Sequence, residues 1–241
     1  MDCMKQFLKH IGWALALALM LPACAKYDLE VGNQRGAEFF GEPSQEAGVA
    51  IGTLRSRDGV RFIRLDGVTC SQIMNGKEVQ DIPDGTRIFL QYRYIVAPTV
   101  DVADFCADAI LVEWASPLDV GALAENPYDR TSKAGGDDPV DILTDWMTSL
   151  EDGFLTLHYS IPTSGSVKHD FSIHPGKAEN EWLLVHDAHG DTKGSLTEGI
   201  VCFDVSKWLP DTQGKTVKLH LDYTDLNHTN KRLTVEYQSP K

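Results

Sequence analysis

The sequence predicts an all-β protein, with a small five-stranded barrel of the OB type followed by an immunoglobulin-like β-sandwich. Three observations lead to this prediction. Apolar and polar residues alternate over many short segments, turn residues recur between those segments, and no amphipathic helix of useful length is present. The spacing divides the strands into a first set of five and a second set of seven, which suit a barrel and a sandwich respectively.

The N-terminus is typical of an exported lipoprotein. Lys5 and Lys9 precede an apolar run at residues 11–21. This run is too short to span a bilayer, which requires about 20 apolar residues, but it has the length of a signal-peptide core. The run ends in LPAC, a lipobox pattern that places a thiol for lipidation at Cys24. The alternative is an ordinary secretory signal with an incidental cysteine.

These features predict the location of the protein. Residues 1–23 form the signal peptide, and residues 24–48 are polar and form a flexible tether. Acyl chains such as palmitate would hold Cys24 at the membrane, since each buried methylene contributes about 0.8 kcal/mol. We expect an outer-membrane lipoprotein of a Gram-negative envelope, on the surface or the periplasmic face. Translation begins at Met1 or Met4.

The net charge limits the classes of partner. The whole sequence carries a formal charge of −13, and removing residues 1–23, with one net positive charge, leaves the mature chain near −14. A phosphate backbone would be repelled, so nucleic acid is not an expected partner. The predicted partners are the membrane, through the lipid anchor, and an unknown envelope protein or glycan.

The cysteines of the mature chain allow one disulfide. Besides Cys24, these are Cys70, Cys106 and Cys202. Cys70 and Cys106 lie in the same predicted domain and are the possible pair in an oxidising compartment. Cys202 lies within a strand-like segment and is expected to pack as a small apolar residue.

The first predicted domain is the OB-like barrel at residues 49–117. In its fourth strand Tyr92 and Tyr94 share the apolar face, so both are expected in the core rather than as a base-stacking pair. The five predicted strands are Val49–Ser56, Val60–Asp66, Lys77–Gln80, Thr86–Val96 and Ala109–Ser116.

A linker is predicted at residues 118–138, because this stretch contains Asn-Pro, Gly-Gly and an acidic pair. The sandwich domain follows at residues 139–241. Its seven strands are expected near residues 140–146, 153–161, 167–174, 181–187, 198–205, 215–223 and 231–238.

Several segments resemble the NigD-like family of bacterial lipoproteins. They are Gly52-Thr53-Leu54, FIRLDG and DGTRIFLQY in the first domain, then DPVDILTDW, DGFLTLHYSI, VKHDFSI, LLVHDAHGD, GIVCFDVSKWLP and LHLDY in the second. The resemblance covers nearly all of the mature chain. It implies an envelope lipoprotein with an OB-type domain and a β-sandwich, and a role in bacteriocin immunity has been suggested for the family. The family has no known catalytic residues that could be assigned to positions of this chain. At the position of Asp187 the family often has Asn, and His189 is an extra histidine relative to the family pattern.

Two clusters in the second domain are candidate sites. His186, Asp187, His189 and Asp191 combine imidazole and carboxylate ligands that suit zinc, although their spacing matches no established motif. The alternative is a polar turn in which these side chains cap backbone groups. Trp146, Trp182 and Trp208 are candidates for stacking on a sugar ring, against the alternative of core packing.

Three further histidines are assigned from strand alternation. His169 alternates with Val167, Phe171 and Ile173, so it is expected on the core face as a hydrogen-bonded structural residue. His158 and His220 fall on the polar faces of their strands, and we expect them to be exposed to solvent.

The sequence favours a non-enzymatic binding or scaffold lipoprotein. It contains no GxSxG elbow, no GxGxxG loop, no HExxH pair and no EF-hand loop, and no cofactor is predicted. Two alternatives stay open. One is immunity or protection against a secreted toxin, and the other is a metal-dependent hydrolase or carbohydrate-active enzyme.

Overall fold

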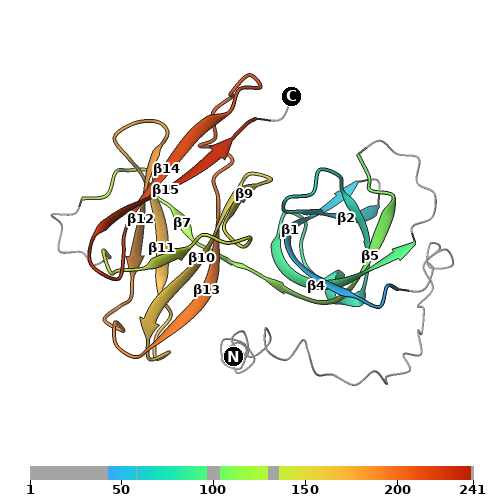
Figure 1. Ribbon diagram of the computed structural model, residues 1–241, viewed down its shortest axis with the longest axis horizontal. Coiled ribbons are helices and arrows are strands. Elements are labelled where there is room, and N and C mark those ends of the chain that lie inside the picture. The colour runs from blue at the N-terminus through green and yellow to red at the C-terminus, as the bar shows by residue number, and fades with distance from the viewer. Residues whose placement is uncertain (1–42, 58, 97–103, 130–135, 240–241) are drawn as a thin grey trace. The chain divides into compact units, whose positions relative to one another are not determined.

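The computed structural model describes residues 43–57, 59–96, 104–129 and 136–239 (Figure 1). The chain divides into two compact units, one ending at Pro117 and the other beginning at Leu118. The signal peptide, Cys24, Met1 and Met4 lie outside the described residues, as does most of the tether. Within the described ranges, no helix is long and apolar enough to cross a membrane.

The first unit is a closed five-stranded barrel (Figure 1). Its strands are β1 (Ala47–Arg57), β2 (Val60–Leu65), β3 (Gln72–Asn75), β4 (Arg87–Val96) and β5 (Asp108–Pro117). Their order around the barrel is β1-β2-β3-β5-β4, and only the β3–β5 pair among these strands is parallel. This five-stranded closed arrangement confirms the predicted OB-type barrel.

Alternate residues of the longer barrel strands contribute to the core. Leu54, Ile63, Ile88, Leu90 and Ile110 are completely buried and pack together as the centre of the core. The period of two places their neighbours in sequence on the outer face, so the strand pattern predicted from alternation is the one that fills the barrel.

The predicted strand at Lys77–Gln80 is wrong. The third strand is Gln72–Asn75, and Lys77–Val79 forms a short 3-10 helix, η2. The chain turns at Gly76, where φ is 140° and an added Cβ would lie 2.7 Å from the Val112 carbonyl oxygen. Val79, buried by this turn, joins the barrel core. The short QIMN segment lacks a clear alternation, because all of its first three side chains are buried.

The predicted burial of Tyr94 in the barrel core is also wrong. Tyr92 is buried as expected, but Tyr94 is 44% exposed. The inward alternation of β4 ends at Tyr92, next to an irregularity in its pairing with β5. Beyond it Ile95 is buried instead, in a small separate cluster with Ile73 and Ala109.

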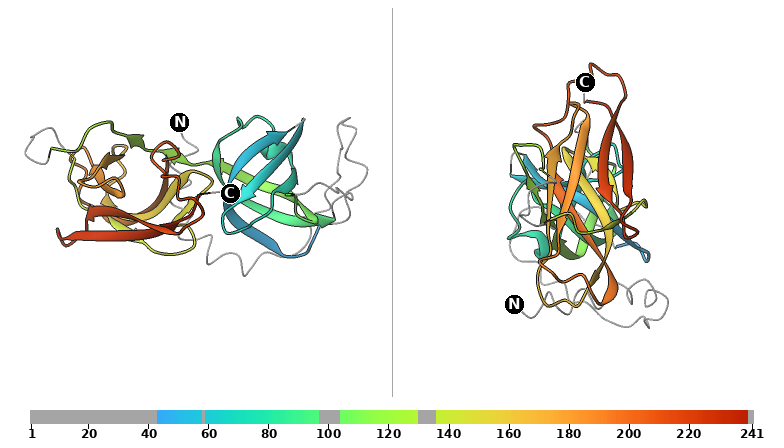
Figure 2. Two further views of the ribbon diagram at one scale, coloured as in Figure 1. Left: turned by 90° about the horizontal axis from the view of Figure 1, so that it is seen from above. Right: turned by 90° about the vertical axis from the view of Figure 1, so that its left-hand side faces the viewer.

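The second unit is a β-sandwich (Figures 1 and 2). One sheet has the order β6-β13-β10-β8, with β9 paired to β10, and the other has the order β15-β14-β12-β11-β7. The strands are β6 (Asp119–Val120), β7 (Ala122–Leu123), β8 (Asp141–Leu143), β9 (Ser149–Glu151), β10 (Phe154–Thr163), β11 (Asp170–Pro175), β12 (Glu181–Asp187), β13 (Ser195–Asp204), β14 (Val217–Thr224) and β15 (Asn230–Tyr237). All seven predicted strand regions contain strands, so the predicted fold class is confirmed. The core between the sheets includes Leu155, Leu157, Ile173, Phe203 and Leu219.

The first residues of the predicted linker, which was placed at residues 118–138, form two short strands. β6 and β7 lie within it, and they pair in parallel with β13 and β11, which belong to opposite sheets. Gly121 between them lies so close to Phe203 that an added Cβ would be 2.1 Å from the ring. The segment from Leu118 therefore belongs to the sandwich, and its strands are too short to show a pattern in the sequence.

Candidate functional site

The four residues of the predicted His–Asp cluster do not converge on one point. His186, near the end of β12, is 2% exposed and faces inward. Asp187 Oδ1 accepts the backbone N–H of His189 at 2.8 Å, and the His189 ring lies 2.8 Å from Asp170 Oδ2. This pairing with Asp170 raises the pKa of His189. The exposed half of the cluster is therefore a polar turn.

Asp191 lies on the far side of His169 from His186, with its Oδ2 3.7 Å from His169 Nε2. Its carboxylate accepts the backbone N–H of Ser164 at 2.9 Å and the hydroxyl of Thr163 at 2.8 Å. These hydrogen bonds keep the pKa of Asp191 well below its usual range. Among the residues that the structure describes, no three His, Cys, Asp or Glu side chains are placed to hold a metal ion.

His186 and His169 form a buried pair whose proton positions follow from their neighbours. His186 Nδ1 lies 3.2 and 3.1 Å from the carbonyl oxygens of Asp138 and Pro139. A carbonyl only accepts, so neutral His186 donates from Nδ1 and accepts at Nε2. His169 Nδ1, 2.9 Å away, then donates to that nitrogen. Burial, followed by the influence of His169, lowers the pKa of His186. The pair ties the segment before β8 to β12 and has a structural role.

The expectation that His158 is exposed is wrong, because the residue is 5% exposed. The turn after β8 covers this face of β10, and Asp145 Oδ2 lies 2.7 Å from His158 Nδ1. His169 is buried as expected, whereas Val167, assigned to the same face, is 43% exposed because β11 begins only at Asp170. His220 is half-buried.

The structure separates the three candidate tryptophans. Trp182 is 3% exposed and belongs to the core, which excludes it as a stacking platform. Trp146 is 54% exposed on the turn after β8, which ends at Leu143, so it does not lie on a strand as predicted. Trp208 is half-buried, with its ring 5.9 Å from that of Trp182. Trp208 thus combines a fixed position with an accessible surface.

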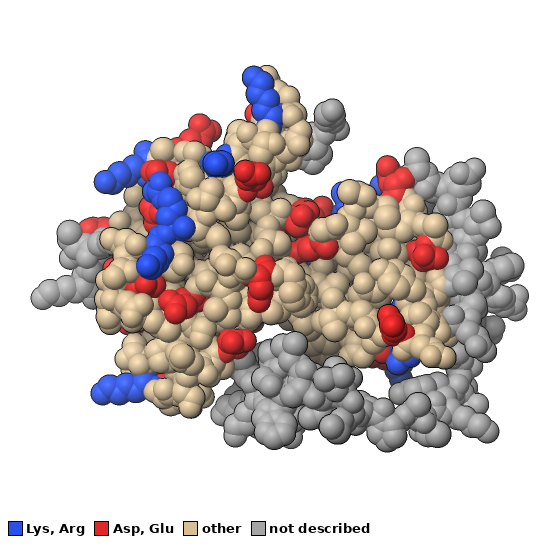
Figure 3. Space-filling model, viewed as in Figure 1, with Lys and Arg blue, Asp and Glu red and all other residues tan. Residues whose placement is uncertain are grey.

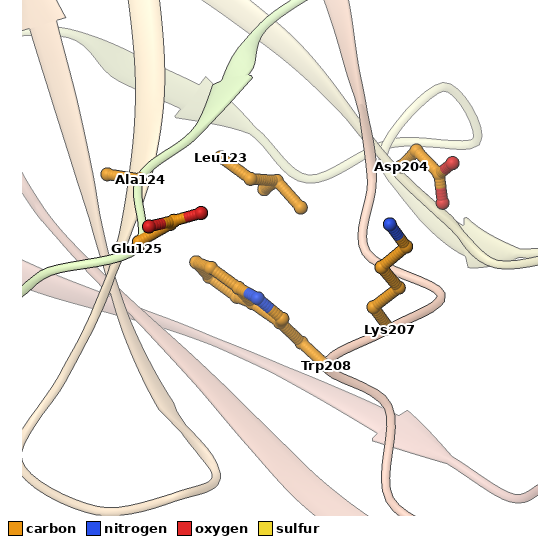
Figure 4. A pocket seen from close by; sticks show the side chains of 6 residues that line it. All are labelled: Leu123, Ala124, Glu125, Asp204, Lys207 and Trp208. Carbon is orange, nitrogen blue, oxygen red and sulfur yellow. The ribbon is translucent and has the colours of Figure 1, made fainter.

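An open pocket of about 270 Å³ lies at Trp208 (Figure 4). The indole lies beneath Leu123, Glu125 borders it on one side, and Lys207 and Asp204 stand on the other. The lining residues are Leu123, Ala124, Glu125, Asp204, Lys207 and Trp208. One aromatic surface is therefore combined with two carboxylates and one ammonium group.

Regular structure fixes both walls of this pocket. The backbone N–H of Ala124, which follows β7, donates to the Ile173 carbonyl at 2.9 Å. On the other side, Asp204 ends β13, and its Oδ1 accepts the Ser206 backbone N–H at 3.1 Å. The backbone N–H of Trp208 closes the same turn by donating to the Val205 carbonyl at 2.8 Å. The Trp208 indole is thus held by a capped turn at the edge of the core.

Sequence reasoning identified Trp208 but missed its partners in the pocket. Leu123, Ala124 and Glu125 lie in the stretch predicted as a linker, and Asp204 and Lys207 lack a recognisable motif. A signal was nevertheless present, because Asp204, Lys207 and Trp208 stand within a few residues at the predicted end of a strand.

Cys70 and Cys106 form a disulfide, and Cys202 is a free, buried thiol. The disulfide joins the segment before β3 to the segment before β5. Beside it, the backbone N–H of Ser71 donates to the Asp104 carbonyl at 2.7 Å. These contacts lie in the barrel and are separate from the Trp208 pocket.

The fold defines a class of two-unit all-β proteins in which an OB-type barrel precedes a β-sandwich. Residues 123–237, which include most of the sandwich, match the family model of the NigD-like C-terminal beta sandwich domain. The resemblance seen in the sequence is thereby confirmed. No curated protein sequence matches the chain.

Solved structures share the fold at low sequence identity. A protein from Parabacteroides distasonis that is described as toxin related superposes with a TM-score of 0.64 at 20% identity, covering 80% of this chain and 94% of that one. A protein of unknown function from Bacteroides vulgatus gives 0.61 at 16% identity, with 80% and 92% coverage. A NigD-like immunity protein from Bacteroides caccae gives 0.56 at 18% identity, with 82% and 99% coverage.

Proposed function

We propose that the protein is a non-enzymatic binding lipoprotein of the outer membrane, which holds a glycan at the Trp208 pocket. The observation that carries the proposal is the half-buried Trp208 indole, lying between carboxylates and a lysine in an open pocket. Its position on a β-sandwich edge makes the surface rigid, and a preformed surface lowers the entropic cost of binding.

The chemistry of the lining suits a pyranose ring. One face of such a ring carries C–H groups that pack on a flat aromatic surface, while its hydroxyl groups require hydrogen-bonding partners at the edge. Glu125 and Asp204 supply acceptors, and Lys207 supplies donors. The pocket volume of about 270 Å³ lies slightly below the range of sites for drug-sized ligands, so a single sugar ring is the proposed unit of recognition.

The proposed location of the protein is the outer membrane, where a lipid on Cys24 would anchor it. The lipobox ending at Cys24 and the polar tether support an acyl-anchored protein whose two units extend from the membrane. Carboxylates are spread over the face shown in Figure 3, in keeping with the net charge of −13. This charge favours a glycan or protein partner over nucleic acid.

Glycan binding can be tested by measuring how the chain from residue 25 onward binds to immobilised multivalent glycans. Trp208→Leu keeps an apolar side chain against the core but removes the flat ring, so binding should weaken by about tenfold or more. Trp146→Ala is the matched control, because it removes an exposed tryptophan of the same sandwich outside the pocket. Equal binding by Trp208→Leu and wild type would refute the proposal.

The same incubation separates binding from catalysis. Glu125 and Asp204 are both carboxylates, which glycoside-cleaving enzymes also employ. We expect the bound glycan to be recovered intact after prolonged incubation. Release of shorter products that stops in Glu125→Gln would instead support a carbohydrate-active enzyme.

Protection against a secreted toxin is a second candidate function. It is favoured by the structural neighbour described as a NigD-like immunity protein, with 18% identity and a TM-score of 0.56. This function predicts that cells expressing the anchored protein survive supernatants of competing strains that kill cells expressing Cys24→Ala. Survival that is unchanged by Trp208→Leu would separate protection from glycan binding.

A further inference from the structure

The charged side chains of the Trp208 pocket narrow the class of glycan that it would bind. We propose that the pocket selects a zwitterionic sugar, which carries a free ammonium group and an acidic group on opposite sides of one ring. This inference rests on the proposed glycan binding at Trp208 and specifies its ligand. The residues that carry it are Glu125 and Lys207, which lie on opposite sides of the indole (Figure 4).

The charges of Glu125 and Lys207 are not compensated by the described part of the chain. Within that part, the Glu125 carboxylate and the Lys207 ammonium group form no ion pair and no hydrogen bond. Both residues are exposed and both line the pocket. A ligand that lies on the indole can therefore pair with either charge without displacing a partner within the protein.

Hydrogen bonds to β11 (Asp170–Pro175) fix the backbone on both sides of Glu125. Before it, the backbone N–H of Ala124 donates to the Ile173 carbonyl at 2.9 Å. After it, the Asn126 carbonyl accepts a hydrogen bond from His174 Nδ1 at 3.0 Å, since a carbonyl can only accept. The position of Glu125 is thus set before a ligand arrives, which lowers the entropic cost of binding.

The turn after β13 places Lys207 at the other side of the indole. The backbone N–H of Trp208 donates to the Val205 carbonyl at 2.8 Å, and Lys207 is one of the two residues between them. Asp204 lies on the same side of the indole, but no ion pair joins these two described residues. Asp204 Oδ1 instead accepts the backbone N–H and the hydroxyl of Ser206, at 3.1 and 2.6 Å.

The cost of desolvation favours a ligand that carries both charges. A neutral sugar on the indole would displace water from a carboxylate and an ammonium group without supplying an ionic partner to either. A sugar with only an acidic group would leave Glu125 unpaired, and one with only an ammonium group would leave Lys207 unpaired. A zwitterionic ring offers its ammonium group to Glu125 and its acidic group to Lys207, so its charges complement those of the pocket.

Glucosaminuronic acid is the appropriate probe, because its amine and its carboxylate lie on opposite sides of one pyranose ring. N-acetylglucosaminuronic acid lacks the ammonium charge, glucosamine lacks the carboxylate, and glucose lacks both. Each sugar is titrated into the mature chain while the indole N–H signal of Trp208 is followed by NMR. We expect each charged group to tighten binding by about two- to fivefold, because the ion pairs are exposed, and added salt to reduce this preference.

Two substitutions assign the preference to particular side chains. Glu125→Gln should abolish the preference for the free amine over its N-acetyl form, and Lys207→Gln should abolish the preference for the carboxylate over glucosamine. Glu179→Gln and Lys193→Gln are the matched controls, because they remove the same charges from exposed residues of the sandwich outside the pocket. Both preferences should persist in these controls.

The outcomes separate this inference from the proposed function. If glycans bind in a manner that depends on Trp208, but the zwitterionic sugar is not preferred, the inference is overturned and glycan binding stands. If no glycan shows binding that depends on Trp208, both are overturned. The inference also fails if the preference persists in Glu125→Gln and Lys207→Gln, or if the control variants lose it equally.

Discussion

Replacing both Cys70 and Cys106 by serine should selectively destabilise the barrel. The disulfide joins residues separated by 36 positions. Closing a loop of this length in the unfolded chain corresponds to about 4 kcal/mol in the chain-entropy relation. Both cysteines are half-buried, so the serine hydroxyls keep access to water and add little desolvation cost. The expected loss is therefore close to the entropic value.

Hydrogen exchange measured by mass spectrometry is the appropriate assay, because it resolves the two units within one chain. A loss of about 4 kcal/mol corresponds to roughly a thousandfold faster exchange of the most protected barrel amides. Exchange in β10 and β13 of the sandwich should be unchanged and provides an internal reference. A change below about 1 kcal/mol in the barrel, or an equal change in the sandwich, would refute the reasoning.

Three further perturbations test the packing and electrostatics of the two units. His186 has a lowered pKa in the folded state, so its contribution to stability is complete above its ordinary pKa of 6.5 and is lost as the pH falls from 6.5 through the folded pKa. Thermal unfolding between pH 7.5 and 5 should show this loss in wild type and a smaller loss in His186→Gln. Gly121→Ala places a methyl group against the Phe203 ring and should lower the free energy of unfolding by about 1–3 kcal/mol in denaturant titration. Asp66→Asn removes the carboxylate that pairs at 2.6 Å with the fully buried Arg87 and should cost about 3 kcal/mol, and an unchanged midpoint would contradict that pairing.

The barrel could be predicted where strands alternate over several residues. In β4, Ile88, Leu90 and Tyr92 occupy every second position and all are buried. The third strand could not be predicted in the same way, because its few residues are buried on both faces. The turn that follows it depends on Gly76 and on the nearby Val112 carbonyl, a contact between distant parts of the sequence.

The same distinction applies to the sandwich. Its long strands follow the predicted ranges, but β6 and β7 have two residues each and are fixed by parallel pairing with β13 and β11. His158 lies on the expected face of β10, yet a turn folds over that face and buries it. Such coverage depends on tertiary structure, and strand periodicity contains no information about it.

The candidate sites were predictable only in part. Trp208 was recognised as an aromatic candidate, but its distinction from Trp182 and Trp146 required the burial of each side chain. In the barrel, the placement of Arg55 and Arg64 on the same face depends on the register of β1 and β2. Sequence spacing alone does not supply that register.

The most direct test of the central proposal is an NMR titration of the tryptophan indole N–H groups of the mature chain. The mature sequence contains Trp114, Trp146, Trp182 and Trp208, so four side-chain signals are expected and can be assigned by single substitutions. On adding the glycan selected by the binding screen, the Trp208 signal should shift and saturate, while the Trp114 and Trp146 signals stay in place. A saturating shift of Trp146 without one of Trp208, or binding that leaves all four signals unmoved, would contradict the account.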